Sequence, residues 1–187
     1  MDTIVIDDIF DDDTNKVIIE YLQKQSGWHL DGDLYNFNIK YDTGDYSDTG
    51  MLLLSYETNR DNYLNQHNST INVLGTLILD KILLKLKPMK FINYKLNRFL
   101  WNYYNKASTG IMHRDMESLT PTRYCSIVYY LNTCDGYTII DDKEYESKSG
   151  RCVIFDSKLL HRGVGPSNDK KRFVLNIMFS YDDIIEE

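Results

Sequence analysis

The second half of the sequence constrains the fold most strongly. From Lys90 onward, short runs rich in Val, Ile, Phe and Tyr alternate with Gly, Asn, Asp and Pro. Branched and aromatic side chains suit a pleated sheet, whereas the residues between the runs favour turns. We expect strands at residues 90–104, 111–114, 124–131, 137–140, 151–156, 159–164 and 172–180. Many short strands in succession are typical of an antiparallel sandwich or barrel.

The first half of the sequence predicts two helices. Asp13 or Thr14 can cap a helix over about residues 15–25, because a short polar side chain can accept a hydrogen bond from the first turn. A second helix is expected over about residues 69–86, where apolar residues recur at helical spacing and Pro88 follows.

The length of the chain suits one domain, residues 1–187. Two further strands are expected in the first half, at residues 3–6 and 51–56. In this interpretation residues 1–89 support a mainly β core of about residues 90–181, and the two helices cover one sheet from outside.

Charge and composition exclude several classes of protein. A net charge of -7 opposes a chain that wraps nucleic acid, which would need clustered Lys and Arg. Residues 1–10 show no signal peptide, and no stretch approaches the roughly 18 apolar residues of a membrane span. Cys125, Cys134 and Cys152 lack metal-site spacing and indicate free thiols in a reducing compartment. We therefore expect a cytoplasmic protein with no nucleic-acid or membrane partner.

The strongest chemical signal comes from three residues of metal-ligand type. His113 and Asp115 flank Arg114, so on a strand their side chains would point to the same face. Such a pair is expected by chance in a chain with 28 acidic residues among 187. His161 adds a third ligand just after the strand expected at residues 151–156. Two histidines and one carboxylate suit iron(II) with open positions, although zinc would also accept them.

Arg172 is the candidate anion-binding residue. The turn at residues 165–169 separates two expected strands. A hairpin centred between Pro166 and Ser167 would place His161 and Arg172 opposite each other on one face, whereas a slip of one residue would turn Arg172 outward. The planar fork of an arginine can hold both oxygens of a carboxylate.

Alternation along two strands predicts which face lines a pocket. In 124–131 and 172–180, one face of each strand is largely apolar and the other mixes polar with apolar residues. The mixed faces consist of Tyr124, Ser126, Val128 and Tyr130, and of Arg172, Val174, Asn176, Met178 and Ser180. We expect these faces to line the pocket; the alternative is that they face solvent.

Together these elements resemble the 2-oxoglutarate/iron(II) dioxygenase superfamily, and most closely its prolyl 4-hydroxylase-like branch. The resemblance covers roughly residues 90–181. The matching elements, in order, are His113-x-Asp115, residues 123–132, residues 150–163, and Arg172 followed by a strand.

The resemblance implies a double-stranded β-helix, which is a jelly-roll, cupin-like barrel with flanking helices. It implies that His113, Asp115 and His161 bind Fe(II). It also implies that Arg172 pairs with the distal carboxylate of the co-substrate 2-oxoglutarate, and that O2 is consumed, with ascorbate as a supporting reductant.

The resemblance further assigns two tyrosines to the co-substrate. Tyr130 matches one of them, and Tyr103, ten residues before His113, matches the other. Tyr104 is the competing choice, because the alternation does not decide which of the two points inward. The chain departs from the branch at Val174, where a hydroxyl residue is frequent, and at residues 135–138, which replace a Gly-Gly-Thr sequence.

The implied reaction is hydroxylation of an unactivated C–H bond, with a peptidyl proline, and hence a protein or peptide partner, as the leading substrate. Residues 31–66 could form a lid over it. The alternatives are a free amino acid or another small molecule, and a non-catalytic jelly-roll module that binds a metal or ligand. A nucleic-acid demethylase of the AlkB type is disfavoured, because Met178 occupies the position of its second arginine.

Overall fold

The computed structural model describes residues 1–25, 29–30, 50–57, 69–87, 89–106, 108–116, 121–168 and 170–186. Its helices are α1 (Asp12–Leu22) and α3 (Ser69–Lys85). Its strands are β1 (Ile4–Ile6), β2 (His29–Leu30), β3 (Gly50–Glu57), β4 (Met89–Ile92), β5 (Lys95–Tyr104), β6 (Arg123–Tyr130), β7 (Tyr137–Ile140), β8 (Lys143–Glu146), β9 (Cys152–Asp156), β10 (His161–Val164), β11 (Arg172–Tyr181) and β12 (Asp183–Glu186).

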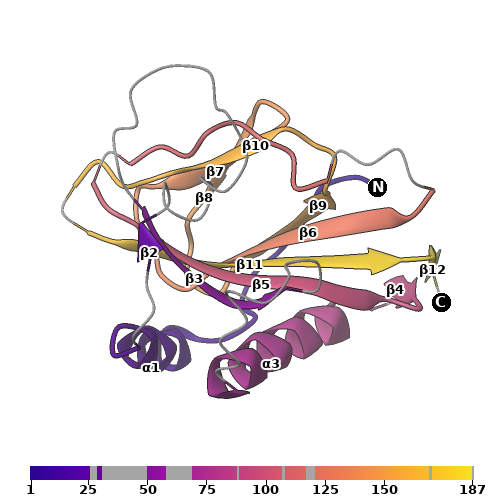
Figure 1. Cartoon of the computed structure of the whole chain (residues 1–187), viewed down its shortest axis with the longest axis horizontal. Coiled ribbons are helices and arrows are strands. Elements are labelled where there is room, and N and C mark those ends of the chain that lie inside the picture. The colour runs from indigo at the N-terminus through magenta and orange to yellow at the C-terminus, as the bar shows by residue number, and fades with distance from the viewer. Residues whose placement is uncertain are drawn as a thin grey trace.

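The strands form three antiparallel sheets. A seven-stranded sheet has the order β1-β9-β6-β11-β5-β3-β2, a three-stranded sheet has the order β10-β7-β8, and β12 pairs with β4. The three-stranded sheet lies over one face of the large sheet, and both helices lie against the other face (Figure 1). This arrangement is the double-stranded β-helix, so the expected jelly-roll fold and the helix-covered sheet are confirmed.

Alternation along the strands separates an outer core from an inner one. The outer core packs helix residues such as Ile18 and Ile82 against Phe173, Leu175 and Ile177 of β11. The inner core, between the two sheets, contains Val128, Tyr130, Ile140, Val153, Phe155 and Val174. Because the mixed faces of β6 and β11 supply residues to the inner core, the expected pocket-lining face is the one enclosed between the sheets.

Helix α1 begins earlier than expected. Asp11, rather than Asp13 or Thr14, is its N-cap, and its side chain accepts a hydrogen bond of 2.8 Å from the backbone N–H of Thr14. Asp12 and Asp13 occupy the first turn, where negative charge interacts favourably with the helix dipole. The second helix, α3, matches its expected range to within one residue at its end.

Several strand predictions needed correction. The expected strand 90–104 is broken at Asn93, which has a φ of 51°, so that β4 leaves the large sheet and pairs with β12. The expected strand 111–114 is only an isolated bridge at His113. The lid expected at residues 31–66 lies outside the described residues, apart from 50–57.

The hairpin expected around Pro166 and Ser167 is also wrong. β10 pairs with β7 in the small sheet, and β11 pairs with β5 and β6 in the large one. His161 therefore lies opposite Ile140, and Arg172 lies opposite Tyr104. The turn connects the two layers of the barrel instead of folding one strand back on its neighbour.

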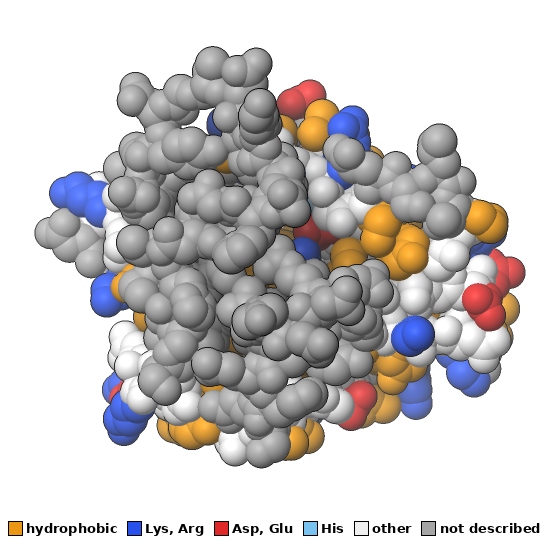
Figure 2. Space-filling model, viewed as in Figure 1, with side chains coloured by type: hydrophobic (Ala, Val, Ile, Leu, Met, Phe, Trp, Pro, Cys, Tyr) orange, Lys and Arg blue, Asp and Glu red, His pale blue; other side chains and the backbone are white. Residues whose placement is uncertain are grey.

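The described residues show no membrane-spanning helix, and their side chains in Figure 2 show no gathered positive charge. Neither helix among the described residues combines the length and apolar character that a bilayer span requires. On the coloured part of the face in Figure 2, Lys and Arg side chains are scattered among acidic, polar and apolar ones.

Candidate metal centre

The structure brings together the three side chains predicted as metal ligands. The ligand atoms of His113, Asp115 and His161 all lie within 4.8 Å of one another. Nε2 of His113 is 3.8 Å from Oδ1 of Asp115, and Nε2 of His161 is 3.5 Å from Oδ2. The side chains of Asp115 and His161 are 7% and 8% exposed, whereas that of His113 is 42% exposed. The cluster is thus enclosed on the barrel side and open at His113.

Backbone pairing explains why residues 48 positions apart in the chain meet. His113 and His161 form an antiparallel bridge with reciprocal hydrogen bonds of 3.0 and 2.9 Å. Gly110 extends this contact by donating a 2.8 Å hydrogen bond to the carbonyl of Gly163. The connection between β5 and β6 therefore runs beside β10, although it forms no regular strand there.

Both imidazole rings are oriented by the backbone. Nδ1 of His113 lies 2.8 Å from the carbonyl of Ile111, and Nδ1 of His161 lies 3.0 Å from the carbonyl of Leu159. A carbonyl oxygen only accepts, so each Nδ1 carries the hydrogen and donates it. In a neutral ring this leaves the lone pair on Nε2, which faces Asp115 in both residues. Outer hydrogen bonds of this kind orient histidine ligands in metal sites.

Burial and neighbouring charges set the protonation states of Asp115 and His161. Burial lowers the pKa of His161 below its ordinary value, although Asp115 opposes the shift. Burial alone would raise the pKa of Asp115, but the charge of Arg98, with smaller contributions from His161, His113 and Ser126, holds it well below its usual range. Near neutral pH the cluster therefore offers one carboxylate and a neutral buried imidazole.

Arg172 is buried in the same interior with incomplete hydrogen bonding. It is 1% exposed, and its Nη2 donates a 2.6 Å hydrogen bond to Oγ1 of Thr138. Its guanidinium carbon lies 4.9 Å from the ring centre of Tyr104 and 5.3 Å from that of Tyr130. Its Nε and Nη1 atoms are buried without a hydrogen-bond partner among the described residues. Two unused donors on a buried cation leave a place for an anion.

The spacing along β10 relates this cation to the metal ligands. A Cβ added to Gly163 would lie 3.0 Å from Nη1 of Arg172, so the guanidinium reaches the strand at this glycine. His161 is two residues earlier, about 7 Å along an extended strand. A short diacid could therefore contact both the metal ligands and Arg172.

The two predicted tyrosines differ in placement. Tyr130 is fully buried beside Arg172, and its hydroxyl donates a 2.8 Å hydrogen bond to Oγ1 of Thr138. Burial raises its pKa, against the opposing charge of Arg172, so its hydroxyl keeps its proton. Tyr103 instead faces the outer side of the sheet, where its ring lies 5.5 Å from that of Phe173. Tyr104, the competing choice, lies opposite Arg172 on β5 and shares its face, so it is the one of the pair that points inward.

Three further side chains shape the site, and only Ser126 among them stood on a face that the sequence predicted to line the pocket. Arg98 and Ser126 donate hydrogen bonds to Oδ1 and Oδ2 of Asp115, and Thr138 accepts from both Arg172 and Tyr130. They come from β5, β6 and β7, and Arg98 lies outside every element of the resemblance. Once Tyr104 is known to point inward, alternation along β5 places Arg98 on the same face, which is the one signal that could have found it.

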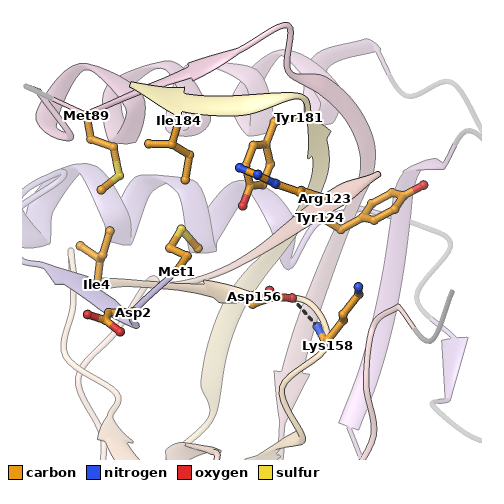
Figure 3. A pocket seen from close by; sticks show the side chains of 10 residues that line it. All are labelled: Met1, Asp2, Ile4, Met89, Arg123, Tyr124, Asp156, Lys158, Tyr181 and Ile184. Carbon is orange, nitrogen blue, oxygen red and sulfur yellow. Dashed lines mark hydrogen bonds between the residues drawn. The ribbon is translucent and has the colours of Figure 1, made fainter. Parts of the chain in front are cut away.

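A surface groove of about 730 Å³ lies apart from this cluster (Figure 3). It is lined by Met1, Asp2, Ile4, Met89, Arg123, Tyr124, Asp156, Lys158, Tyr181 and Ile184. None of the three predicted ligands and neither inward-facing tyrosine lines it. The groove is therefore separate from the candidate metal centre.

The fold and the cluster together define a jelly-roll protein of the type found in 2-oxoglutarate/Fe(II) oxygenases. No protein-family model matches the sequence, and no curated protein matches it either. Solved structures that contain bound 2-oxoglutarate match the fold, at sequence identities that show the fold alone.

Three such structures illustrate the likeness. The collagen prolyl hydroxylase of Paramecium bursaria Chlorella virus-1, in complex with 2-oxoglutarate, is 15% identical with a TM-score of 0.58, over 97% of this chain and 96% of that one. HygX of Streptomyces hygroscopicus, with nickel and 2-oxoglutarate bound, is 13% identical with a TM-score of 0.64, over 96% and 82%. The epimerase SnoN, in complex with Fe3+, alpha ketoglutarate and nogalamycin RO, is 9% identical with a TM-score of 0.65, over 99% and 81%.

Proposed function

We propose that residues 1–187 form a single-domain, Fe(II)- and 2-oxoglutarate-dependent oxygenase that hydroxylates an unactivated C–H bond. The observation that carries the proposal is Arg172, a buried cation with two unpartnered donors in the interior where three metal-type ligands converge. A metal site alone would also suit zinc or a structural role. An anionic ligand beside Arg172 would supply acceptors for both buried donors and a counter-charge for the guanidinium.

Each residue has a defined role in this proposal. His113, Asp115 and His161 would hold the iron, which together with 2-oxoglutarate and O2 supplies the oxidation of the C–H bond and yields succinate and CO2. Arg172 would bind the distal carboxylate of 2-oxoglutarate through its free donors. Tyr130 would fix the guanidinium through Thr138, to which both donate.

The surroundings of Arg172 favour tight binding of such a co-substrate. Tyr104, in place of Tyr103, would contribute the second tyrosine contact. Val128, Phe155 and Val174 belong to the inner apolar core and would exclude water from the ion pair. A charge-assisted hydrogen bond is worth more where water is excluded, so the apolar walls strengthen the grip of Arg172 on a carboxylate.

The leading substrate is a peptidyl proline, with a protein or peptide partner. This choice is supported by the resemblance of the sequence motifs to prolyl 4-hydroxylases and by the likeness of the fold to a viral collagen prolyl hydroxylase. A small molecule is the alternative, since SnoN shares the fold and holds nogalamycin RO.

The free thiols of Cys125 and Cys152 are buried in the core, which supports a reducing, cytoplasmic location.

The test measures binding and turnover on one preparation. Without oxygen, the wild-type chain should bind Fe(II) and then 2-oxoglutarate; in air with ascorbate and a proline-rich peptide, it should form succinate and a hydroxylated peptide. His161→Ala should lose iron binding. Arg172→Met should keep iron binding and lose about 100-fold in affinity for 2-oxoglutarate, because a buried charge pair loses one partner.

Lys171→Met is the matched control, since Lys171 precedes Arg172 but lies over the outer ring of Tyr103. It should retain both affinities. A wild-type chain that binds neither iron nor 2-oxoglutarate would contradict the proposal and favour a non-catalytic module. Succinate formation with free amino acids or other small molecules, and none with peptides, would replace the peptidyl substrate with the alternative.

A further inference from the structure

Arg98 lies in the barrel interior and binds the carboxylate of the metal cluster. It stands on β5 directly opposite Met178 of β11. Its Nη2 donates a hydrogen bond to Oδ1 of Asp115, and its side chain is 15% exposed. The only carboxylate of the cluster is therefore already paired with a permanent cation before an ion arrives.

Asp115 has a second partner of a different kind. The hydroxyl of Ser126 donates a 2.6 Å hydrogen bond to Oδ2, and it is itself 2.8 Å from the hydroxyl of Ser157. Arg98 and Ser126 thus fix the plane of one carboxylate from its two oxygens. One partner is charged and the other is neutral, so the two contacts should affect a bound cation in opposite directions.

We infer that Arg98 is a positioning residue that lowers the affinity of the site for divalent ions, whereas Ser126 raises that affinity. Both residues orient Asp115, but only Arg98 also neutralises it and repels the incoming ion. With Arg98 present, the carboxylate and guanidinium together contribute no net charge to the donor set. The inference rests on the proposed metal site and needs no co-substrate or turnover.

Two effects of Arg98 oppose each other, the orientation of Asp115 and the repulsion of the ion, and their relative sizes decide whether Arg98 raises or lowers the metal affinity. Loss of an outer contact to a metal ligand typically weakens metal binding 10- to 100-fold. An ion on Asp115 would be separated from Arg98 by the carboxylate alone, on the order of 5 Å. At that distance, repulsion between a divalent ion and a guanidinium already exceeds about tenfold in affinity with the full screening of bulk water. In this largely buried site the screening is weaker, and Ser126 still orients Asp115, so charge outweighs the loss of one contact.

The experiment compares the binding of Co(II), without co-substrate, to the wild-type full chain and to four variants of it. Calorimetry and the visible spectrum of bound Co(II) give the affinity and the geometry of the ligands. Arg98→Met should bind Co(II) at least about tenfold more tightly than wild type. Ser126→Ala should bind it about tenfold more weakly, and Arg98→Lys should stay within a few-fold of wild type because it keeps the charge.

Arg123→Met is the matched control, because Arg123 pairs with Asp183 at the exposed start of β6. Its affinity for Co(II) should equal that of wild type.

Thermal unfolding provides a second readout. Without metal, Arg98→Met should melt at a lower temperature, since a buried carboxylate loses its partner. The rise in melting temperature on adding Co(II) should be larger than in wild type.

If Arg98→Met folds only in the presence of metal, the release of Co(II) to a chelator replaces calorimetry, and release should be slower than from wild type. Weaker binding or faster release, in the same direction as for Ser126→Ala, would overturn the inference and reduce Arg98 to a support for Asp115. A wild-type chain that binds no divalent ion would overturn both the inference and the proposed metal site.

Discussion

Two arginine side chains reach into the barrel interior, and they differ in whether a carboxylate of the protein neutralises their charge. Arg98 is paired with a carboxylate, Asp115, whereas Arg172 donates a hydrogen bond to the neutral oxygen of Thr138. Burying a cation without a counter-charge is costly, so a buried residue of this kind suits a ligand that supplies the charge. At the scale of single residues, the interior is prepared for a cation at one place and for an anion at another.

The two neighbouring tyrosines of β5 provide a test of this view. Tyr104→Phe should raise the dissociation constant of 2-oxoglutarate by about tenfold, because the ring that faces Arg172 loses its hydroxyl while keeping its shape. Tyr103→Phe is the matched control and should leave the constant unchanged, since this ring packs on Phe173 outside the barrel. The measurement is calorimetric titration of the metal-loaded protein. An effect of Tyr103→Phe alone would restore the original assignment.

The sequence predicted side-chain chemistry better than side-chain direction. His113, Asp115, His161 and Arg172 were selected because their types, in this order, suit one chemistry, and the structure brings the first three together. Tyr103 was preferred to Tyr104 on the resemblance alone, because adjacent strand residues face opposite sides and the phase of β5 depends on its pairing with β11, which sets Tyr104 opposite Arg172. A strand's phase is set by its partners, which its own residues do not reveal.

At the scale of elements, the connection from β10 to β11 differs most from the prediction, because the two strands do not form a hairpin. The turn residues correctly predicted a chain reversal, but their composition does not say whether the next strand pairs with the previous one. Here the chain crosses from the small sheet to the large one, so His161 and Arg172 stand on different sheets. The guanidinium of Arg172 reaches the small sheet at Gly163, two residues after His161.

Helix α1 is tied to the large sheet by a buried polar contact that allows a second test. Asn15 is fully buried, accepts a 2.6 Å hydrogen bond from the hydroxyl of Tyr129, and donates one of 3.0 Å to Ser149. Asn15→Leu should lower the free energy of unfolding by about 1–3 kcal/mol, because it leaves the buried hydroxyl of Tyr129 without an acceptor. Urea denaturation followed by circular dichroism measures the change.

A double-mutant cycle separates this hydrogen bond from packing. Adding Tyr129→Phe to Asn15→Leu should recover part of the loss, because the unsatisfied hydroxyl is removed with its acceptor. Lys16→Leu, at an exposed position one residue along α1, should change stability little. Strictly additive effects of Asn15→Leu and Tyr129→Phe would show that the hydrogen bond does not couple the helix to the sheet.

For the whole molecule, the succession of short strand-forming runs separated by turn residues was enough to predict the architecture. Alternating residues on β6 and β11 each serve two cores, one under the helices and one between the sheets. Packing against both cores produces an alternation in the sequence, since one face of each strand must be apolar and the other can carry polar groups. An exposed strand needs no such alternation. For this reason the short β8, whose residues are largely exposed, was not predicted.

The edge of the large sheet connects global stability to pH. Asp7, just after β1, accepts hydrogen bonds of 2.7 and 3.2 Å from Arg151 and one of 3.0 Å from Lys148. The bonds from Arg151 are the main reason that the pKa of Asp7 falls from 3.8 to about 2. Because the folded-state pKa is depressed, the stabilisation is present above about pH 4 and is lost as the pH falls toward 2.

Asp7→Asn should therefore lower the free energy of unfolding at pH 7 by at most about 1 kcal/mol, since the pair is partly exposed and screened. The difference from wild type should persist down to about pH 4 and shrink as the pH falls through the folded-state pKa of about 2, where wild-type Asp7 itself becomes protonated. Urea denaturation across this range measures both quantities. Glu20→Gln removes the same charge from an exposed position of α1 and should show no such convergence. A difference that grows as the pH falls would have the wrong sign for an ion pair and would show that Asp7 acts through some other contact.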